Sequence, residues 1–125
     1  MLTGICFGTD DLKSAIAFYD SVMPILGLTR TVTEEFEAGY GVKGATPDFW
    51  IVRPFNEQPA THGNGTQAMF GVTTETLVDQ AHQTALENGG TDEGPPGPRS
   101  YSPGYYGAYF RDLDGNKIHV AYIPN

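Results

Sequence analysis

An internal duplication restricts the fold of this chain more than any other feature of its sequence. Phe7-Gly8-Thr9 precedes a stretch with helical periodicity, and Phe70-Gly71-Val72 precedes a second such stretch 63 residues later. The segment FWIVRP closes the first half, as IHVAYIP closes the second. Repeated segments in the same order indicate that a chain folds as copies of one structural unit. We therefore expect two similar modules.

The first module is predicted to contain a strand, a helix and three further strands. Residues 2–8 read as a strand, and Thr9, Asp10 and Asp11 supply a helix N-cap and an acidic first turn. Pro24 and Gly27 end this helix. Its apolar residues recur at helical spacing: Leu12, Ala15, Ile16, Tyr19, Val22 and Met23. Extended runs follow at about residues 29–33, 36–42 and 48–54.

The second module is predicted to repeat this βαβββ order. A strand at residues 66–72 leads to a helix at 75–88, which Gly89-Gly90 stops. Alternation indicates a strand at 105–110, and the turn Asp114-Gly115-Asn116 leads into the last strand at 117–123. The segment between helix and alternating strand, residues 91–103, is rich in proline, so we expect it at a sheet edge or in a loop.

Length and charge limit what such a chain does. Its 125 residues suit one domain, so we expect a single α+β domain over 1–125 with modules at about 1–56 and 64–125. A net charge of −8 with only seven Lys and Arg residues argues against nucleic-acid and anionic-membrane partners. One cysteine, Cys6, cannot form an internal disulfide, and no apolar run reaches the roughly 20 residues that span a bilayer. A cytoplasmic location is the expectation.

The sequence resembles the glyoxalase, bleomycin-resistance and extradiol-dioxygenase superfamily, also called vicinal oxygen chelate proteins. The resemblance covers nearly the whole chain and is carried by three stretches: DDLKSAIAFYDSVMPILGL, ALENGGTDEGPPG and YYGAYFRDLDGNKIHVAY. It implies a glyoxalase-like fold in which two βαβββ modules form a curved mixed sheet around a cavity. It also implies small-molecule ligands, commonly a divalent metal, and a homodimer.

Strand periodicity predicts which side chains face that cavity, because residues i and i+2 of a strand lie on the same side of a sheet. Ile5 and Phe7 suit the helix side of the first strand, and their counterparts Ala68 and Phe70 suit the helix side of the other module. The predicted cavity-facing residues are Gly4, Cys6 and Gly8, then Gln67, Met69 and Gly71, and in the last strand Lys117, His119 and Ala121. Trp50 takes the place of His119 in the first module.

The resemblance also locates where a metal would be held. Metal-binding relatives carry His or Gln on the first strand of each module and Glu on the last, and the matching residues here are Gly4, Trp50, Gln67 and His119. Glycine has no side chain, and the Trp indole only donates a hydrogen bond. Catalytic metal sites usually need three protein ligands. No cofactor is therefore expected, and a divalent metal is disfavoured.

What remains is a predicted small-molecule pocket with few polar groups on aromatic walls. The candidate walls are Trp50, Met69 and Tyr106, the candidate polar contacts are Gln67, His119 and Cys6, and the candidates to cover the mouth are Arg99 and Tyr101. Arg99 would suit a carboxylate or phosphate group. His119 is either a general base or ligand contact, or a strand histidine bonded to a neighbour.

Simpler interpretations stand beside these. Gln67 also suits a hydrogen bond within the sheet, Trp50 a place in the core, and Cys6 the role of a small buried hydrophobe. His62 and His82 are expected to be solvated, and Asp112 and Asp114 to hold a turn. Three functions stay open: a small-molecule-binding protein with a degenerate metal site, a metal-dependent lyase, isomerase or dioxygenase, and a drug-sequestering resistance protein.

Overall fold

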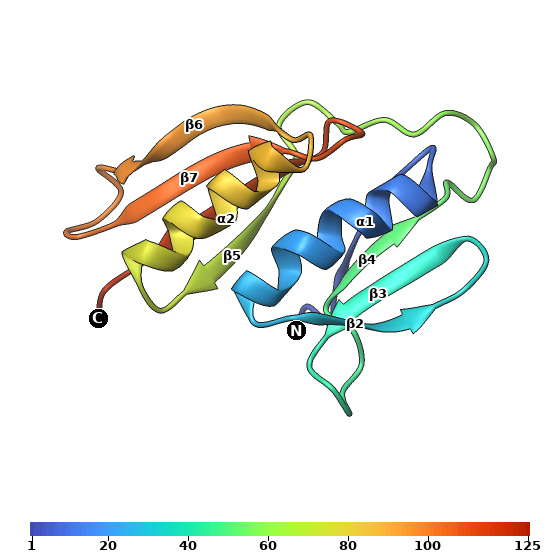
Figure 1. Cartoon of the computed structure of the whole chain (residues 1–125), viewed down its shortest axis with the longest axis horizontal. Coiled ribbons are helices and arrows are strands. Elements are labelled where there is room, and N and C mark those ends of the chain that lie inside the picture. Colours follow the sequence, from blue (N-terminus) through green and yellow to red (C-terminus); the bar gives the residue numbers. More distant parts are fainter.

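The computed structural model describes residues 1–125 and contains two four-stranded sheets, each covered on one face by a helix (Figure 1). The elements of the first module are β1 (Ile5–Gly8), α1 (Leu12–Val22), the short 3-10 helix η1 (Met23–Leu26), β2 (Thr29–Thr33), β3 (Glu37–Gly41) and β4 (Phe49–Val52). Those of the second are β5 (Gln67–Val72), α2 (Glu75–Glu87), β6 (Thr91–Pro98), β7 (Tyr106–Arg111) and β8 (Lys117–Tyr122). The predicted α+β fold of two βαβββ modules is confirmed.

Both sheets have the same topology. Their strand orders are β1-β4-β3-β2 and β5-β8-β7-β6, and in each module the first strand runs parallel to the last. Cys6 pairs with Trp50 in the first sheet, and Met69 pairs with His119 in the second. Trp50 is therefore the counterpart of His119, as the sequence predicted.

Side-chain caps and a left-handed glycine define the helix ends. Asp11 accepts a hydrogen bond from the Ser14 backbone N–H, and Thr74 caps α2 in the same way through Leu77 N–H. Gly27 has a φ of 84°, a conformation that costs a residue with a Cβ atom but not glycine, and it turns the chain from η1 into β2.

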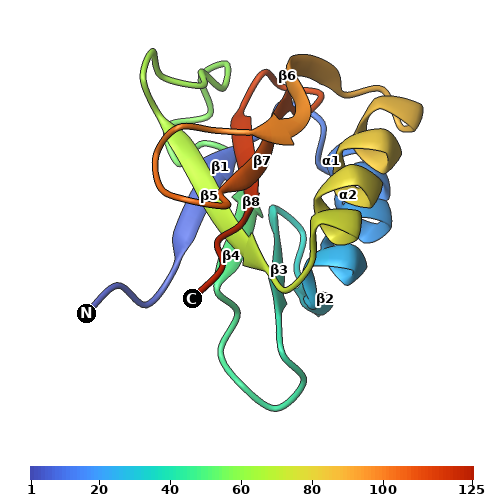
Figure 2. The same cartoon turned by 90° about the vertical axis from the view of Figure 1, so that its left-hand side faces the viewer.

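One core joins the two modules. The two helices lie on the same side of the sheets and contact each other (Figure 2), while the opposite faces of the sheets carry no helix. Apolar residues from both modules form a single buried cluster, in which the aromatic rings of Phe18, Tyr19, Phe49 and Phe110 make edge-to-face or tilted contacts. Burial of such rings is a main source of stability in a domain of this size.

The turn between β7 and β8 fastens the second module to the first. The buried carboxyl group of Asp112 accepts hydrogen bonds from the Tyr19 hydroxyl of α1 at 2.6 Å and from the side-chain amide of Asn116 at 2.9 Å. The same amide donates to the Gly8 carbonyl at the end of β1, and Asp114 accepts from the Asp10 backbone. The predicted turn role of these aspartates is confirmed, and the turn also forms the polar junction of the modules.

The surroundings of His82 differ from the expectation. His82 does not lie in solvent: it is buried against Phe110, and its Nε2 atom lies 2.8 Å from an oxygen of Asp92. The sequence missed this because α2 is covered by β6 along the side that carries His82.

The proline-rich segment does form an edge strand, β6, whose pairing with β7 shifts register twice around Gly94. No helix of the structure combines the length and apolar character that crossing a bilayer requires.

We expect Tyr19→Phe to lower the free energy of unfolding by about 1.5–3 kcal/mol, because it removes a buried hydrogen bond to a carboxyl group. Urea denaturation followed by circular dichroism measures this change. The matched control is Tyr106→Phe, which removes a hydrogen bond to the exposed Asp79 and should cost less than about 1 kcal/mol. Equal losses in the free energy of unfolding for the two variants would show that the buried hydrogen bond at the junction stabilises the fold no more than an exposed one.

Candidate ligand-binding site

His119 lies on the helix-free face of the second sheet and is held at both ring nitrogens. Its Nδ1 atom is 2.9 Å from the Ala108 carbonyl oxygen, and its Nε2 atom is 2.7 Å from the Tyr105 hydroxyl. A carbonyl oxygen only accepts, so Nδ1 carries the hydrogen and the neutral ring accepts the Tyr105 hydrogen at Nε2. Burial lowers the pKa of His119, and the charges of Arg99 and Lys117 lower it further.

Three tyrosine rings surround this histidine. Tyr109 stacks on His119 with ring centroids 4.0 Å apart, and the ring of Tyr105 is also nearly parallel to it. Tyr101 shares a hydrogen bond of 2.7 Å with the Tyr109 hydroxyl and meets the Tyr105 ring edge-on. Burial raises the pKa of Tyr109 to about 12, so this hydroxyl keeps its proton at neutral pH. We call these four residues the ring cluster.

A hollow of about 330 Å³ lies over the ring cluster. Gln67 and Met69 of β5 complete its walls. This volume is within the usual range for small-molecule sites. Because Met69 and the rings are apolar while the Gln67 amide and the tyrosine hydroxyls are polar, the hollow combines a mainly apolar wall with a few polar groups.

Two cations that form no ion pair lie near the Tyr109 ring, which is one wall of the hollow. The Lys117 ammonium lies 5.0 Å from the Tyr109 ring centroid, and the Arg99 guanidinium lies 5.6 Å from it. The other three arginines form ion pairs: Arg30 with Asp20, Arg53 with Glu57, and Arg111 with Glu93. Arg111 is the cross-strand neighbour of Lys117, so the Glu93 carboxylate also lies near Lys117 but is held by Arg111. A chain with a net charge of −8 thus has a local positive region beside the ring cluster.

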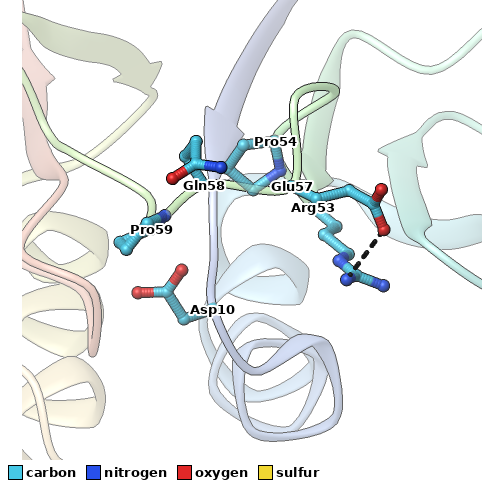
Figure 3. A pocket seen from close by; sticks show the side chains of 6 residues that line it. All are labelled: Asp10, Arg53, Pro54, Glu57, Gln58 and Pro59. Atoms are coloured by element: carbon cyan, nitrogen blue, oxygen red, sulfur yellow. Dashed lines mark hydrogen bonds and ion pairs between the residues drawn. The ribbon is translucent and has the colours of Figure 1, made fainter.

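A second polar hollow, of about 380 Å³, lies where the chain leaves β4, and its charged groups are already matched. Figure 3 shows the ion pair between Arg53 and Glu57, and Asp10 accepts a hydrogen bond from the Ala60 backbone at 2.7 Å. The remaining lining residues, Pro54, Gln58 and Pro59, add no reactive group. The ring cluster is therefore the better candidate site.

Comparisons with known proteins place this fold in a family. The model of the Glyoxalase/Bleomycin resistance protein/Dioxygenase superfamily matches residues 3–120. The chain belongs to this superfamily. A glyoxalase/bleomycin resistance protein from Albidiferax ferrireducens T118 is 37% identical, with a TM-score of 0.87 and 98% of each chain covered.

More distant members share the fold alone. A glyoxalase-related enzyme from Fulvimarina pelagi is 20% identical, with a TM-score of 0.79 over 99% of this chain and 88% of that one. The fosfomycin resistance protein FosX from Listeria monocytogenes is 18% identical, with a TM-score of 0.70 over 99% and 93%. No curated protein matches the sequence.

Among the residues that the sequence singled out, the structure brings four together. Gln67, Met69, Tyr101 and His119 line the same hollow, and Arg99 lies at its border. The guanidinium of Arg99 donates to three backbone carbonyls, those of Pro95, Gly97 and Pro98. It therefore holds the bend of β6 and contributes positive charge, but both Nη atoms already donate to carbonyls, so it does not present the open fork expected for a carboxylate.

The predicted position of Tyr106 is wrong. Tyr106 lies on the helix side of β7, where its hydroxyl donates to Asp79 of α2, and Tyr105 and Tyr109 take the expected place beside His119. Alternation carried the missing signal, since Ala108 and Phe110 are the buried apolar pair of β7 and the residues between them must face the other way.

Cys6 and Trp50 lie on the other sheet. Cys6 is exposed, which corrects the expectation of a buried hydrophobe, and the helix side of β1 is filled by Ile5 and Phe7 instead. Desolvation and the charge of Glu37 raise the pKa of this thiol, so it is a weak nucleophile. Trp50 is half-buried over Gly39, where a Cβ atom would lie 3.0 Å from the indole ring.

The residues of one chain do not fit the divalent metal that is common in the superfamily. Gly4 and Trp50 offer no ligand atom, and both nitrogens of His119 already make hydrogen bonds. Gln67 alone remains of the four equivalent positions. Nowhere in the chain do three His, Cys, Asp or Glu side chains form a group that could hold a metal ion.

We expect nitrogen NMR of the His119 ring to show a protonated Nδ1 and an unprotonated Nε2 at neutral pH, with a midpoint below 6.5. The folded-state pKa is lowered, so the unfolded chain takes up this proton first. The contribution of His119 to stability is complete above about pH 6.5 and is lost as the pH falls towards the folded-state value. Tyr105→Phe serves as the control and should leave the tautomer unchanged, since Ala108 still holds Nδ1. A proton on Nε2 at pH 7 would contradict this assignment.

Proposed function

We propose that this superfamily member binds a small organic anion in the hollow over the ring cluster, and that it does so without a metal ion. The observation that carries the proposal is the pair of cations Arg99 and Lys117, which form no ion pair and lie beside an aromatic wall in an otherwise acidic chain. Charge attraction would concentrate and orient an anion there, while the rings and Met69 would contact its apolar part.

The polar groups around the hollow divide into donors and acceptors. Lys117 and the side-chain amide of Gln67 can donate hydrogen bonds to a carboxylate. The Tyr101 and Tyr109 hydroxyls share one hydrogen bond, so one of the two still has a hydrogen to donate to a ligand. Tyr105 gives its hydrogen to His119, so it faces a ligand only as an acceptor. A ligand with an anionic group and a hydrogen-bond donor would match this arrangement.

This geometry changes the role proposed for His119. A general base needs a free lone pair that reaches the ligand, and the Nε2 lone pair is taken up by Tyr105. We assign His119 a positioning role: it orients the Tyr105 hydroxyl and supports the stacked Tyr109 ring. Its nearly complete burial also makes His119 part of the packing of the sheet.

The alternatives fit less well. A cationic drug would be repelled by Arg99 and Lys117, which argues against sequestration of such drugs in this hollow. Metal-dependent lyase, isomerase or dioxygenase chemistry would need ligands that the side chains at this site do not supply. The predicted homodimer and cytoplasmic location stay predictions.

The anion proposal is tested by calorimetric titration with phenylacetate, a small aromatic carboxylate. We expect binding by the wild type and a loss of about fivefold in affinity for Lys117→Gln, the factor that corresponds to roughly 1 kcal/mol for one solvated charge. Affinity should also fall with added salt. The matched control is Lys43→Gln, an exposed lysine in the other module, which should leave affinity unchanged. Absence of binding by phenylacetate, or the same affinity for both variants and the wild type, would refute the proposal.

Metal dependence is tested separately. Elemental analysis of protein purified without chelator should find much less than one equivalent of zinc, nickel, manganese or iron, and titration with these ions should show no tight binding. Phenylacetate affinity should also be the same with and without EDTA, because no metal bridges the anion to the protein. Stoichiometric tight metal would favour the metal-dependent alternative instead.

A further inference from the structure

A third hollow, larger than the other two, adjoins the ring cluster. Its volume is about 570 Å³, and it lies between the first strands of the two modules. Gln67 and Met69 are walls of both hollows, so the two spaces are neighbours with these side chains between them. Met69 is 62% exposed although it is a large apolar residue. Its position between two open spaces is unusual for a residue of this type.

The larger hollow is mainly apolar. Leu2 and Ile5 come from the start of the chain, Leu26 and Leu28 from the region of η1, and Phe70 from β5. Leu2 is 78% exposed, and the other four are only partly buried. When an apolar ligand covers exposed apolar groups around one hollow and removes them from water, the free energy falls, which favours binding.

Charges give the combined space a direction. Lys117 and Arg99 lie beside the ring cluster, whereas Asp48 is the one charged residue that lines the larger hollow. A carboxylate would be attracted at the first end and repelled at the second. An elongated ligand with one anionic end is therefore oriented with its charge over the ring cluster and its apolar body across Met69.

We propose that the ligand is an amphipathic carboxylate, with its anionic head over the ring cluster and an alkyl or aryl-alkyl tail in the hollow between β1 and β5. The inference rests on the proposed anion site and adds the chemical class of the ligand. Gln67 lies where head and tail meet, and its amide can donate to the carboxylate. Along β5 the hollow extends over residues 67–71, about 13 Å of extended strand, which suits a medium-length chain.

Calorimetric titration with butanoate, hexanoate, octanoate and decanoate, each below its micelle concentration, tests the inference. Affinity should rise about twofold to fourfold per added methylene, the gain that burial of a methylene gives. Leu2→Asn places a polar group in the hollow at an exposed position and should flatten this dependence without affecting the fold. Leu28→Asn should act in the same way. Leu113→Asn, at an exposed leucine of the β7–β8 turn, is the matched control and should keep the full dependence.

The outcomes separate this inference from the proposed function. Phenylacetate binding together with equal affinities for the four alkyl carboxylates would overturn the amphipathic ligand and leave the anion site standing. Failure of phenylacetate and of all four alkyl carboxylates would overturn both. If Leu2→Asn converts a dimer into a monomer in sedimentation and the alkyl series is flat, the hollow is an interface between copies of the chain and the inference is wrong.

Discussion

The buried carboxyl group of Asp112 is the contact on which the arrangement of the modules depends. Four donors reach it: the Tyr19 hydroxyl, the backbone and side-chain amides of Asn116, and the Asp114 backbone. Burial raises the pKa of Asp112, and these donors oppose that shift, which is the expected balance for a carboxyl group taken out of water. Because one donor belongs to α1, this turn ties the second sheet to the first helix. Together with the shared core, that tie fixes how the two modules lie beside each other.

Most of the fold could be predicted from the sequence because it depends on short-range patterns. The helix ends follow from Asp11, Thr74 and Gly27, whose capping and left-handed conformations are local properties. The place of Trp50 as the counterpart of His119 follows from the duplication, since a slip of one residue would turn the apolar side of the strand away from the helix. The burial of His82 could not be predicted, because it depends on how β6 lies over α2.

The candidate site was predicted only in part, for a related reason. His119, Gln67 and Met69 were found because strand alternation places them on one face. The rings that hold His119 come from β7 and from the loop before it. Alternation with Ala108 and Phe110 would have placed Tyr106 on the helix side, but no local pattern sets the contact of Tyr101 with Tyr109. A histidine in a strand gives no sign of whether its nitrogens are free, and here Ala108 and Tyr105 occupy both.

The duplication has left two helix-free faces of very different chemistry. Where the second module pairs Met69 with His119, the first pairs Cys6 with Trp50, and these are the only cysteine and the only tryptophan of the chain. The molecule thus carries its one indole and its one site for thiol labelling side by side on the first sheet, whereas the ring cluster lies on the second. Indole fluorescence reports on whatever covers the first sheet, and a chromophore attached to Cys6 would mark the same face.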